Sequence, residues 1–160
     1  MSVFVRGAGL GALSGLAATI LMSVVMISAR RAGISGELPP DKIAEAAVEG
    51  ATGREATEGE EDAVAAVTHL GFGAVAGALF GLMVARMRSV PDAAAAALGA
   101  VFASGVWLVS YQGWVPFLHI MRPASEDRPG RTVTMVVAHW VYGMTLGVTT
   151  LRLRDLLGRD

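Results

Sequence analysis

Two histidines are the residues of this sequence best suited to chemistry. They begin two similar segments, 69–73 (His-Leu-Gly-Phe-Gly) and 139–143 (His-Trp-Val-Tyr-Gly), in which an aromatic residue and a glycine follow at the same spacing. An imidazole can ligate a haem iron or a metal ion, and it can take up or release a proton near neutral pH. The sequence contains no cysteine, which excludes disulfides, thiolate metal sites and cysteine nucleophiles. His69 and His139 are therefore the candidate cofactor-binding residues.

The positions of His69 and His139 restrict what they can do. Each lies seven or eight residues inside an uncharged segment, which is about 10 Å along a helix that rises roughly 1.5 Å per residue. Buried imidazoles need partners, so they must face the helix bundle or a wet cavity. Three roles stay open: a neutral histidine hydrogen-bonded across the helix pair to Thr68, Ser23 or a carbonyl group; a haem or metal ligand; and a proton or ion relay. No catalytic residue and no dedicated metal site are predicted, because no Asp, Glu or Cys lies at comparable depth.

The elements that must position the histidines are four long uncharged segments. Each is at least 20 residues long and contains none of the 13 basic and 14 acidic residues. About 20 apolar residues suffice for a helix to cross a hydrocarbon core of roughly 30 Å, and uninterrupted runs of this length favour helices over the shorter, alternating strands of a barrel. We therefore predict an all-α, multi-pass membrane protein, a single transmembrane domain over residues 1–160 with helices at about 7–29, 63–85, 93–115 and 132–151.

The connection 32–62 between the first two predicted spans divides into two parts. Pro39-Pro40-Asp41 is typical of a helix start, because proline is tolerated in the first turn and an acid favours the positive end of the helix dipole. Apolar residues then share one face, which predicts a short amphipathic helix at the membrane surface over residues 41–49. The Gly-rich, acidic stretch 51–62 is predicted to be a solvated loop.

Pro116 is expected to end or kink the third span. It lacks the N–H group that a regular helix needs, so we predict that the regular helix stops or bends at residues 113–116. Tyr111, Trp114 and Phe117 would then lie at the depth of the membrane interface, where amphipathic aromatic side chains are enriched.

Small residues recur at every fourth position of the predicted spans. This spacing places them on one helix face, and such faces let two helix backbones approach closely inside a bilayer. Helix packing is the role we predict for them, with a subunit interface and room for a flat cofactor as alternatives. The glycines concerned are Gly7, Gly11 and Gly15 in the first span, Gly73, Gly77 and Gly81 in the second, and Gly143 and Gly147 in the fourth.

The matching segments 69–73 and 139–143 divide the chain into two helical hairpins. Because both second helices run the same way across the membrane, the hairpins are predicted to form a parallel pseudo-repeat about an axis along the membrane normal. Basic residues are densest in the short turn 86–92 and beside the two termini, which predicts that both termini lie in the cytoplasm. The net charge of −1 does not indicate a nucleic-acid partner.

Several of these features together resemble the YagU-like group of uncharacterised bacterial inner-membrane proteins. They are Pro39-Pro40-Asp41, the histidine-led second span, the Ala- and Gly-rich third span with its late proline, and the segment 138–143 (Ala-His-Trp-Val-Tyr-Gly) followed by an Arg-rich tail. The resemblance implies the bacterial inner membrane as location and a link to acid tolerance. It implies no established biochemistry.

Two functions follow from these residues. The first is a structural or accessory subunit without enzyme activity, whose Gly-lined faces mediate self-association or assembly with other membrane protein subunits in the lipid bilayer. It is favoured because the sequence shows no nucleophile–base pair and no carboxylate within a span. The alternative is a membrane protein that uses His69 and His139 to bind a cofactor, with haem as the candidate, or to handle protons or ions.

Overall fold

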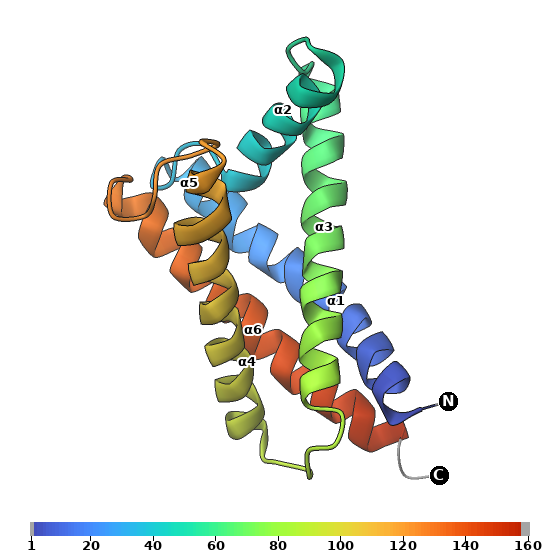
Figure 1. The fold of residues 1–160 in the computed structure, drawn as a ribbon. Coiled ribbons are helices and arrows are strands. Elements are labelled where there is room, and N and C mark those ends of the chain that lie inside the picture. Colours follow the sequence, from blue (N-terminus) through green and yellow to red (C-terminus); the bar gives the residue numbers. More distant parts are fainter. Residues whose placement is uncertain (1, 158–160) are drawn as a thin grey trace.

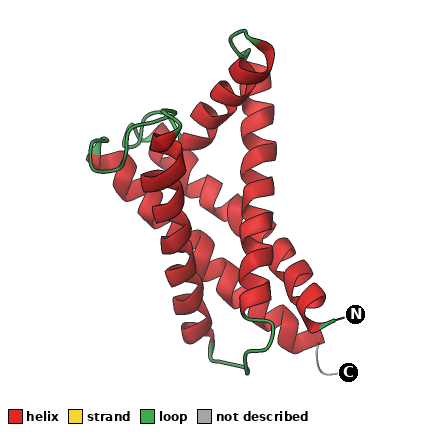
Figure 2. Cartoon of the chain, viewed as in Figure 1, coloured by secondary structure: helices red, strands yellow, loops and turns green. Residues whose placement is uncertain are grey.

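The chain folds into four long helices and a shorter one. The computed structural model describes residues 2–157, and no strand occurs in that range (Figure 1, Figure 2). This confirms the all-α prediction. The long helices are α1 (Val3–Arg31), α3 (Glu58–Met83), α6 (Pro129–Leu157) and a composite helix of α4 (Asp92–Trp107), η1 (Leu108–Trp114) and α5 (Val115–Phe117), while α2 (Pro39–Thr52) lies in the first connection.

Three of the long helices are long and apolar enough to cross a membrane: α1, α3 and the composite helix from Asp92 to Phe117. α6 is also long enough, with 29 residues, and it has no charge between Arg131 and Arg152. Five threonines and His139 make α6 less apolar than the other three. The fourth predicted span, 132–151, therefore stays a prediction.

The helices pack as two pairs, α1 with α3 and α4 with α6, and the contact between α1 and α6 joins the pairs. In the view of Figure 1, α1 and α6 cross behind α3 and α4, and both ends of the chain lie at one end of the bundle. α3 and α4 touch each other only slightly. The two long helices that follow one another most directly in the chain therefore make little contact with each other.

Many large apolar side chains face outward, while several of the fully buried residues are small. Ala18, Ala103 and Ala138 are fully buried, whereas Val75 and Val101 are 71% and 74% exposed. A soluble bundle has the opposite arrangement, because burial of large apolar side chains is what stabilises it in water. The outer surface of this bundle is therefore suited to lipid, where helices associate through small residues.

α2 extends further than the predicted surface helix 41–49. It begins at Pro39 and ends at Thr52, where Gly53 adopts a left-handed conformation with a φ of 70° that commonly follows a helix end. Leu38 and Ala44 are buried, and α2 packs against α3. The first connection therefore covers one end of the bundle with an ordered helix.

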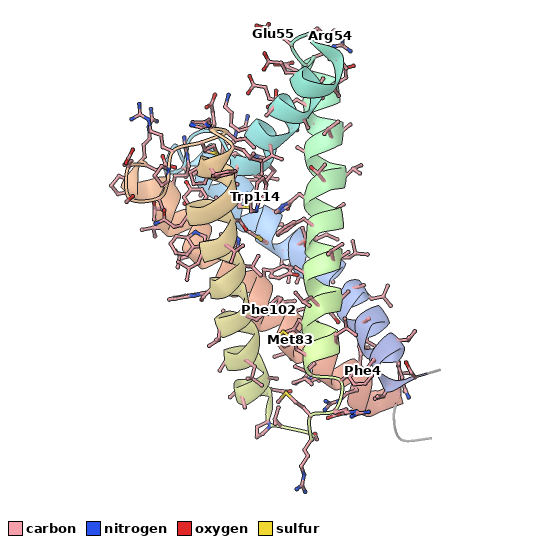
Figure 3. All side chains as sticks on the ribbon, viewed as in Figure 1. Phe4, Arg54, Glu55, Met83, Phe102 and Trp114 are labelled. Carbon is pink, nitrogen blue, oxygen red and sulfur yellow. The ribbon has the colours of Figure 1, made fainter. Side chains whose placement is uncertain are left out.

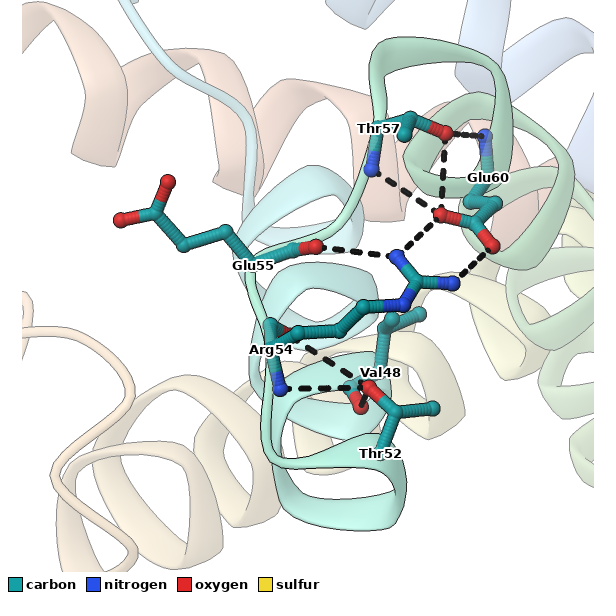
Figure 4. Close-up of polar contacts among 6 residues, drawn as sticks. All are labelled: Val48, Thr52, Arg54, Glu55, Thr57 and Glu60. Carbon is teal, nitrogen blue, oxygen red and sulfur yellow. Dashed lines mark hydrogen bonds and ion pairs between the residues drawn. The ribbon is translucent and has the colours of Figure 1, made fainter.

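The acidic stretch 51–62 is not a loop throughout, and that prediction was wrong for its second half. α3 begins at Glu58: the Thr57 hydroxyl accepts a hydrogen bond from the Glu60 N–H at 3.4 Å, and the Glu60 carboxylate accepts one from the Thr57 N–H at 3.1 Å. The Arg54 guanidinium donates to the same carboxylate at 2.6 and 2.8 Å (Figure 4). The positive end of the helix dipole also stabilises acidic residues in the first turn. The acidic residues that suggested a loop therefore lie at the start of a helix.

The third long helix changes its geometry earlier than predicted and does not stop at Pro116. The regular α-helix ends at Trp107, and η1 continues it as a wider π-helix in which the Val115 N–H donates to the Ser110 carbonyl. In a regular helix the proline ring would collide with the carbonyl four residues before it. A wider turn ahead of Pro116 relieves this collision, so the chain stays helical to Phe117.

Candidate functional site

His69 and His139 line one cavity inside the bundle. His69 comes from α3 and His139 from α6, so the two segments that match in sequence meet in space although they belong to different helix pairs. The cavity has a volume of about 260 Å³, just below the range of roughly 300–1,000 Å³ that is common for ligand sites. Most of its walls are apolar, formed by side chains that include Met22, Met26, Phe72, Val106 and Trp114.

The hydrogen bond of His139 defines its chemistry. Its Nδ1 lies 2.7 Å from the Met135 carbonyl of the same helix, and because a carbonyl can only accept, Nδ1 must carry the proton. Nε2 of His139 is then left with a free lone pair, as in histidines that bind a metal or accept a hydrogen bond from a ligand. The partner is thus a carbonyl on the histidine's own helix and not a group across the helix pair.

His69 differs, because its Nε2 is buried without a hydrogen-bond partner in the described part of the chain. The Thr68 hydroxyl, one partner considered from the sequence, donates instead to the Val64 carbonyl at 2.6 Å. An unpaired polar atom in an apolar environment is unfavourable by about 1–3 kcal/mol. The arrangement therefore leaves a site where a ligand's polar group would be stabilised.

Tyr142 connects the two matching segments directly. Its hydroxyl donates a hydrogen bond to the Gly73 carbonyl at 2.7 Å, from α6 to α3. Tyr142 is 3% exposed and lines the cavity with Gly73. The tyrosine of segment 139–143 is thus hydrogen-bonded to the glycine of segment 69–73. This bond links the two helices that carry the histidines.

The predicted glycines lie where helix backbones touch. A Cβ atom added to Gly77 would lie 2.8 Å from the Gly15 Cα, and one added to Gly7 would lie 2.7 Å from the Gly81 carbonyl oxygen. Both distances are shorter than real Cβ atoms show. The structure brings Gly7, Gly11 and Gly15 of α1 against Gly81, Gly77 and Gly73 of α3, and it brings Gly143 and Gly147 of α6 against Gly99 and Ala95 of α4. These faces leave no room for a flat cofactor.

A buried charged cluster near the cavity was missed by the sequence interpretation. Arg131 Nη1 lies 2.9 Å from Asp127 Oδ1, and Arg131 Nε donates to the Ser35 carbonyl at 3.0 Å. The Asp127 side chain is only 5% exposed. The Tyr111 hydroxyl donates to the same carboxylate, and Tyr111 also lines the cavity, so the cluster closes one end of it. Asp127 follows a predicted span in a polar connection, and no local pattern marks it as buried.

The aromatic residues near Pro116 do not form one exposed belt. Tyr111 is 3% exposed and stacks with Trp107 at a ring distance of 6.2 Å, whereas Phe117 is 79% exposed. Trp114 lines the cavity. Within residues 2–157, His69 and His139 are joined by no third His, Asp or Glu in a group that could hold a metal ion.

Comparison with known proteins places the chain in an uncharacterised group. The model of a family described as "Family of unknown function (DUF6789)" matches residues 5–157. No curated protein and no solved structure matches the chain.

Proposed function

The chain belongs to the DUF6789 family, and we propose from its own cavity that it is a four-span membrane protein that binds a small apolar molecule carrying a carbonyl or hydroxyl group. The observation that carries this proposal is the pair of imidazoles in an apolar cavity, with Nε2 of His69 buried and unpartnered. Such a ligand would place its polar group at the histidines and its apolar part against the methionine and aromatic walls.

The exposed face of α6 supports its role as the fourth span. Val133 and Val137 are exposed, whereas Thr134 and Thr150 are buried. Thr149 donates its hydroxyl proton to the Thr145 carbonyl at 2.7 Å, which satisfies a polar group inside the helix. With α6 included, the pairs α1–α3 and α4–α6 would be the two hairpins of a parallel repeat. The resemblance to the YagU-like group adds the bacterial inner membrane as the proposed location.

The ligand would enter from the lipid. The cavity is partly open and lies between α3 and η1, on the side where α3 and α4 are not packed together. Phe72, which lines it, is 47% exposed. Quinones are one class of molecule with the required chemistry, because they partition into bilayers and carry carbonyl groups on an apolar ring.

Haem ligation and a proton relay fit the cavity less well. The cavity has about 260 Å³, less than the roughly 300–1,000 Å³ of sites for drug-sized ligands, and a haem is at least as large as such ligands. A relay needs a chain of polar groups or water, which apolar walls do not favour. No reaction is proposed, since a general acid and base would have to come from the two histidines alone.

The accessory-subunit function stays a prediction with less support. The eight glycines that suggested it contact helices of the same chain. They therefore leave no Gly-lined face at those positions for self-association or for another membrane subunit.

Binding of menadione, a small naphthoquinone, tests the proposed function. We expect it to quench tryptophan fluorescence, because Trp114 lines the cavity, and to bind about tenfold more weakly to His69→Phe, which loses a group that can donate to a quinone carbonyl. Its reduced form, menadiol, has hydroxyl protons to donate and should bind more weakly to His139→Phe as well, because Nε2 of His139 can only accept. The control is His119→Asn: His119 lies outside the cavity with a φ of 59°, a conformation that asparagine adopts. Equal affinity of all three variants and wild type would refute the proposal. A Soret band in washed protein would replace it with haem ligation.

The four-span arrangement is tested by reporter fusions. We expect fusions in the turn 86–92 and after residue 157 to report the cytoplasm, and fusions near Gly50 and Ser125 to report the opposite side, because cation density in short connections sets orientation. Reversed signals at all four sites would contradict the predicted orientation but would leave the four-span arrangement intact. A signal at Ser125 on the same side as the C-terminus would remove α6 as a span.

A further inference from the structure

We propose that the end of the bundle away from the histidine cavity binds the phosphate group of an anionic phospholipid. The inference rests on the membrane-spanning arrangement proposed above but not on the ligand of the cavity. A second pocket, of about 450 Å³, lies at this end among the first turns of α1, the turn after α3 and the last turns of α6. Three arginines line it: Arg6, Arg86 and Arg154.

Arg154 is held in place by the protein. Its Nη1 donates to the carbonyls of Val84 and Met87 at 3.0 and 2.9 Å, in the turn that follows α3. Its Nε and Nη2 donate to Asp155 at 3.0 and 2.8 Å. These bonds hold Arg154 in place as part of the pocket wall, and the Asp155 carboxylate offsets the positive charge of Arg154.

Arg6 and Arg86 supply the uncompensated charge. Within residues 2–157 neither forms an ion pair. The Arg86 guanidinium lies 4.7 Å from the centre of the Phe4 ring, a cation–π contact that orients it beside the pocket. Guanidinium groups match phosphate oxygens in geometry as well as charge. A pocket with two such unpaired cations is therefore suited to a phosphate-bearing anion.

The apolar surroundings favour a lipid over free phosphate. Val3, Phe4 and Val5 are exposed beside the pocket on α1, and Met83 is exposed at the end of α3. Figure 3 shows Phe4 and Met83 at this same end of the bundle. A headgroup in the pocket would leave its acyl chains along these side chains, as basic pockets at helix ends do for anionic lipids. The site would lie in the cytoplasmic leaflet in the orientation proposed above.

Lipid binding by native mass spectrometry tests this inference on the full chain in detergent. We expect phosphatidylglycerol to bind more tightly than phosphatidylcholine, and Arg6→Gln and Arg86→Gln each to weaken phosphatidylglycerol about fivefold, the effect of removing one cation near a bound anionic lipid. The matched control is Arg88→Gln, which removes the same charge from the same turn but does not line the pocket. It should bind like wild type.

Three outcomes would overturn the inference. Equal losses for Arg86→Gln and Arg88→Gln would indicate unspecific attraction, and equal affinity for the two lipids would exclude recognition of the anion. Competition by inorganic phosphate at the same concentration as the lipid would indicate a site for free phosphate. Thermal unfolding and size-exclusion chromatography show that each variant is folded. Because neither measurement depends on the cavity, a failure here is distinct from a failure of the proposed cavity function.

Discussion

Replacing Gly77 by leucine is expected to separate α1 from α3 and to abolish the folded, monodisperse protein or lower its melting temperature by about 6–12 °C. The new side chain would start 2.8 Å from the Gly15 Cα, where only backbone atoms are present and no side chain can move aside. Overpacking of a tight interior destabilises by about 1–3 kcal/mol, and each kcal/mol lowers the melting temperature by roughly 2–4 °C in a chain of this size. A contact with backbone lies at the upper end of that range.

Gly71→Leu provides the matched control for Gly77→Leu. Gly71 lies in the same helix, but a Cβ atom added there meets nothing within 4 Å, so its leucine would extend into the surroundings and leave the melting temperature unchanged. Thermal unfolding and size-exclusion chromatography in mild detergent measure both variants. In the other helix pair, Gly147→Leu should behave like Gly77→Leu, and Gly105→Leu, which also meets nothing, should behave like Gly71→Leu. Equal stability of Gly77→Leu and Gly71→Leu would show that the close contact does not hold the helices together.

Replacing Asp127 by alanine should destabilise the protein by about 3–5 kcal/mol, because it leaves the Arg131 guanidinium buried without a counter-charge. Asp127 is the group that joins Tyr111 of η1 to Arg131 of α6, so its loss also frees the connection that covers the cavity. Thermal unfolding measures the effect. Menadione affinity should fall in parallel, since Tyr111 lines the cavity.

Two further variants test whether the destabilisation comes from loss of the ion pair or from the removal of any negative charge in this region. Glu126→Ala removes the neighbouring carboxylate, which is exposed, and should leave the melting temperature unchanged. The double variant Asp127→Ala with Arg131→Met removes both charges and should regain much of the stability, because an apolar pair of similar size tolerates burial. A double variant as unstable as Asp127→Ala would mean that the bond from Arg131 to the Ser35 carbonyl is the more important one.

Local regularities made the helices predictable. Uncharged length alone indicated the long helices, and the spacing of four residues indicated which glycines share a face. The start of α3 was predictable too, because Thr57 and Glu60 form a recognisable capping pattern, and the acidic composition of residues 51–62 obscured it. The π-helical turns before Pro116 were only partly predictable: the proline indicates that regular geometry must fail, but not how far back the chain adjusts.

The sequence by itself determined the helices, their small-residue faces and the two histidines as the residues to examine. Only the tertiary structure decided that His69 and His139 share a cavity, that Tyr142 bonds to Gly73, and that Asp127 is buried. The physical reason is the range of the interactions. Periodicity and capping act over a few neighbouring residues, whereas the cavity depends on how α1, α3, η1 and α6 cross, and that is set by contacts between residues that are far apart in the chain.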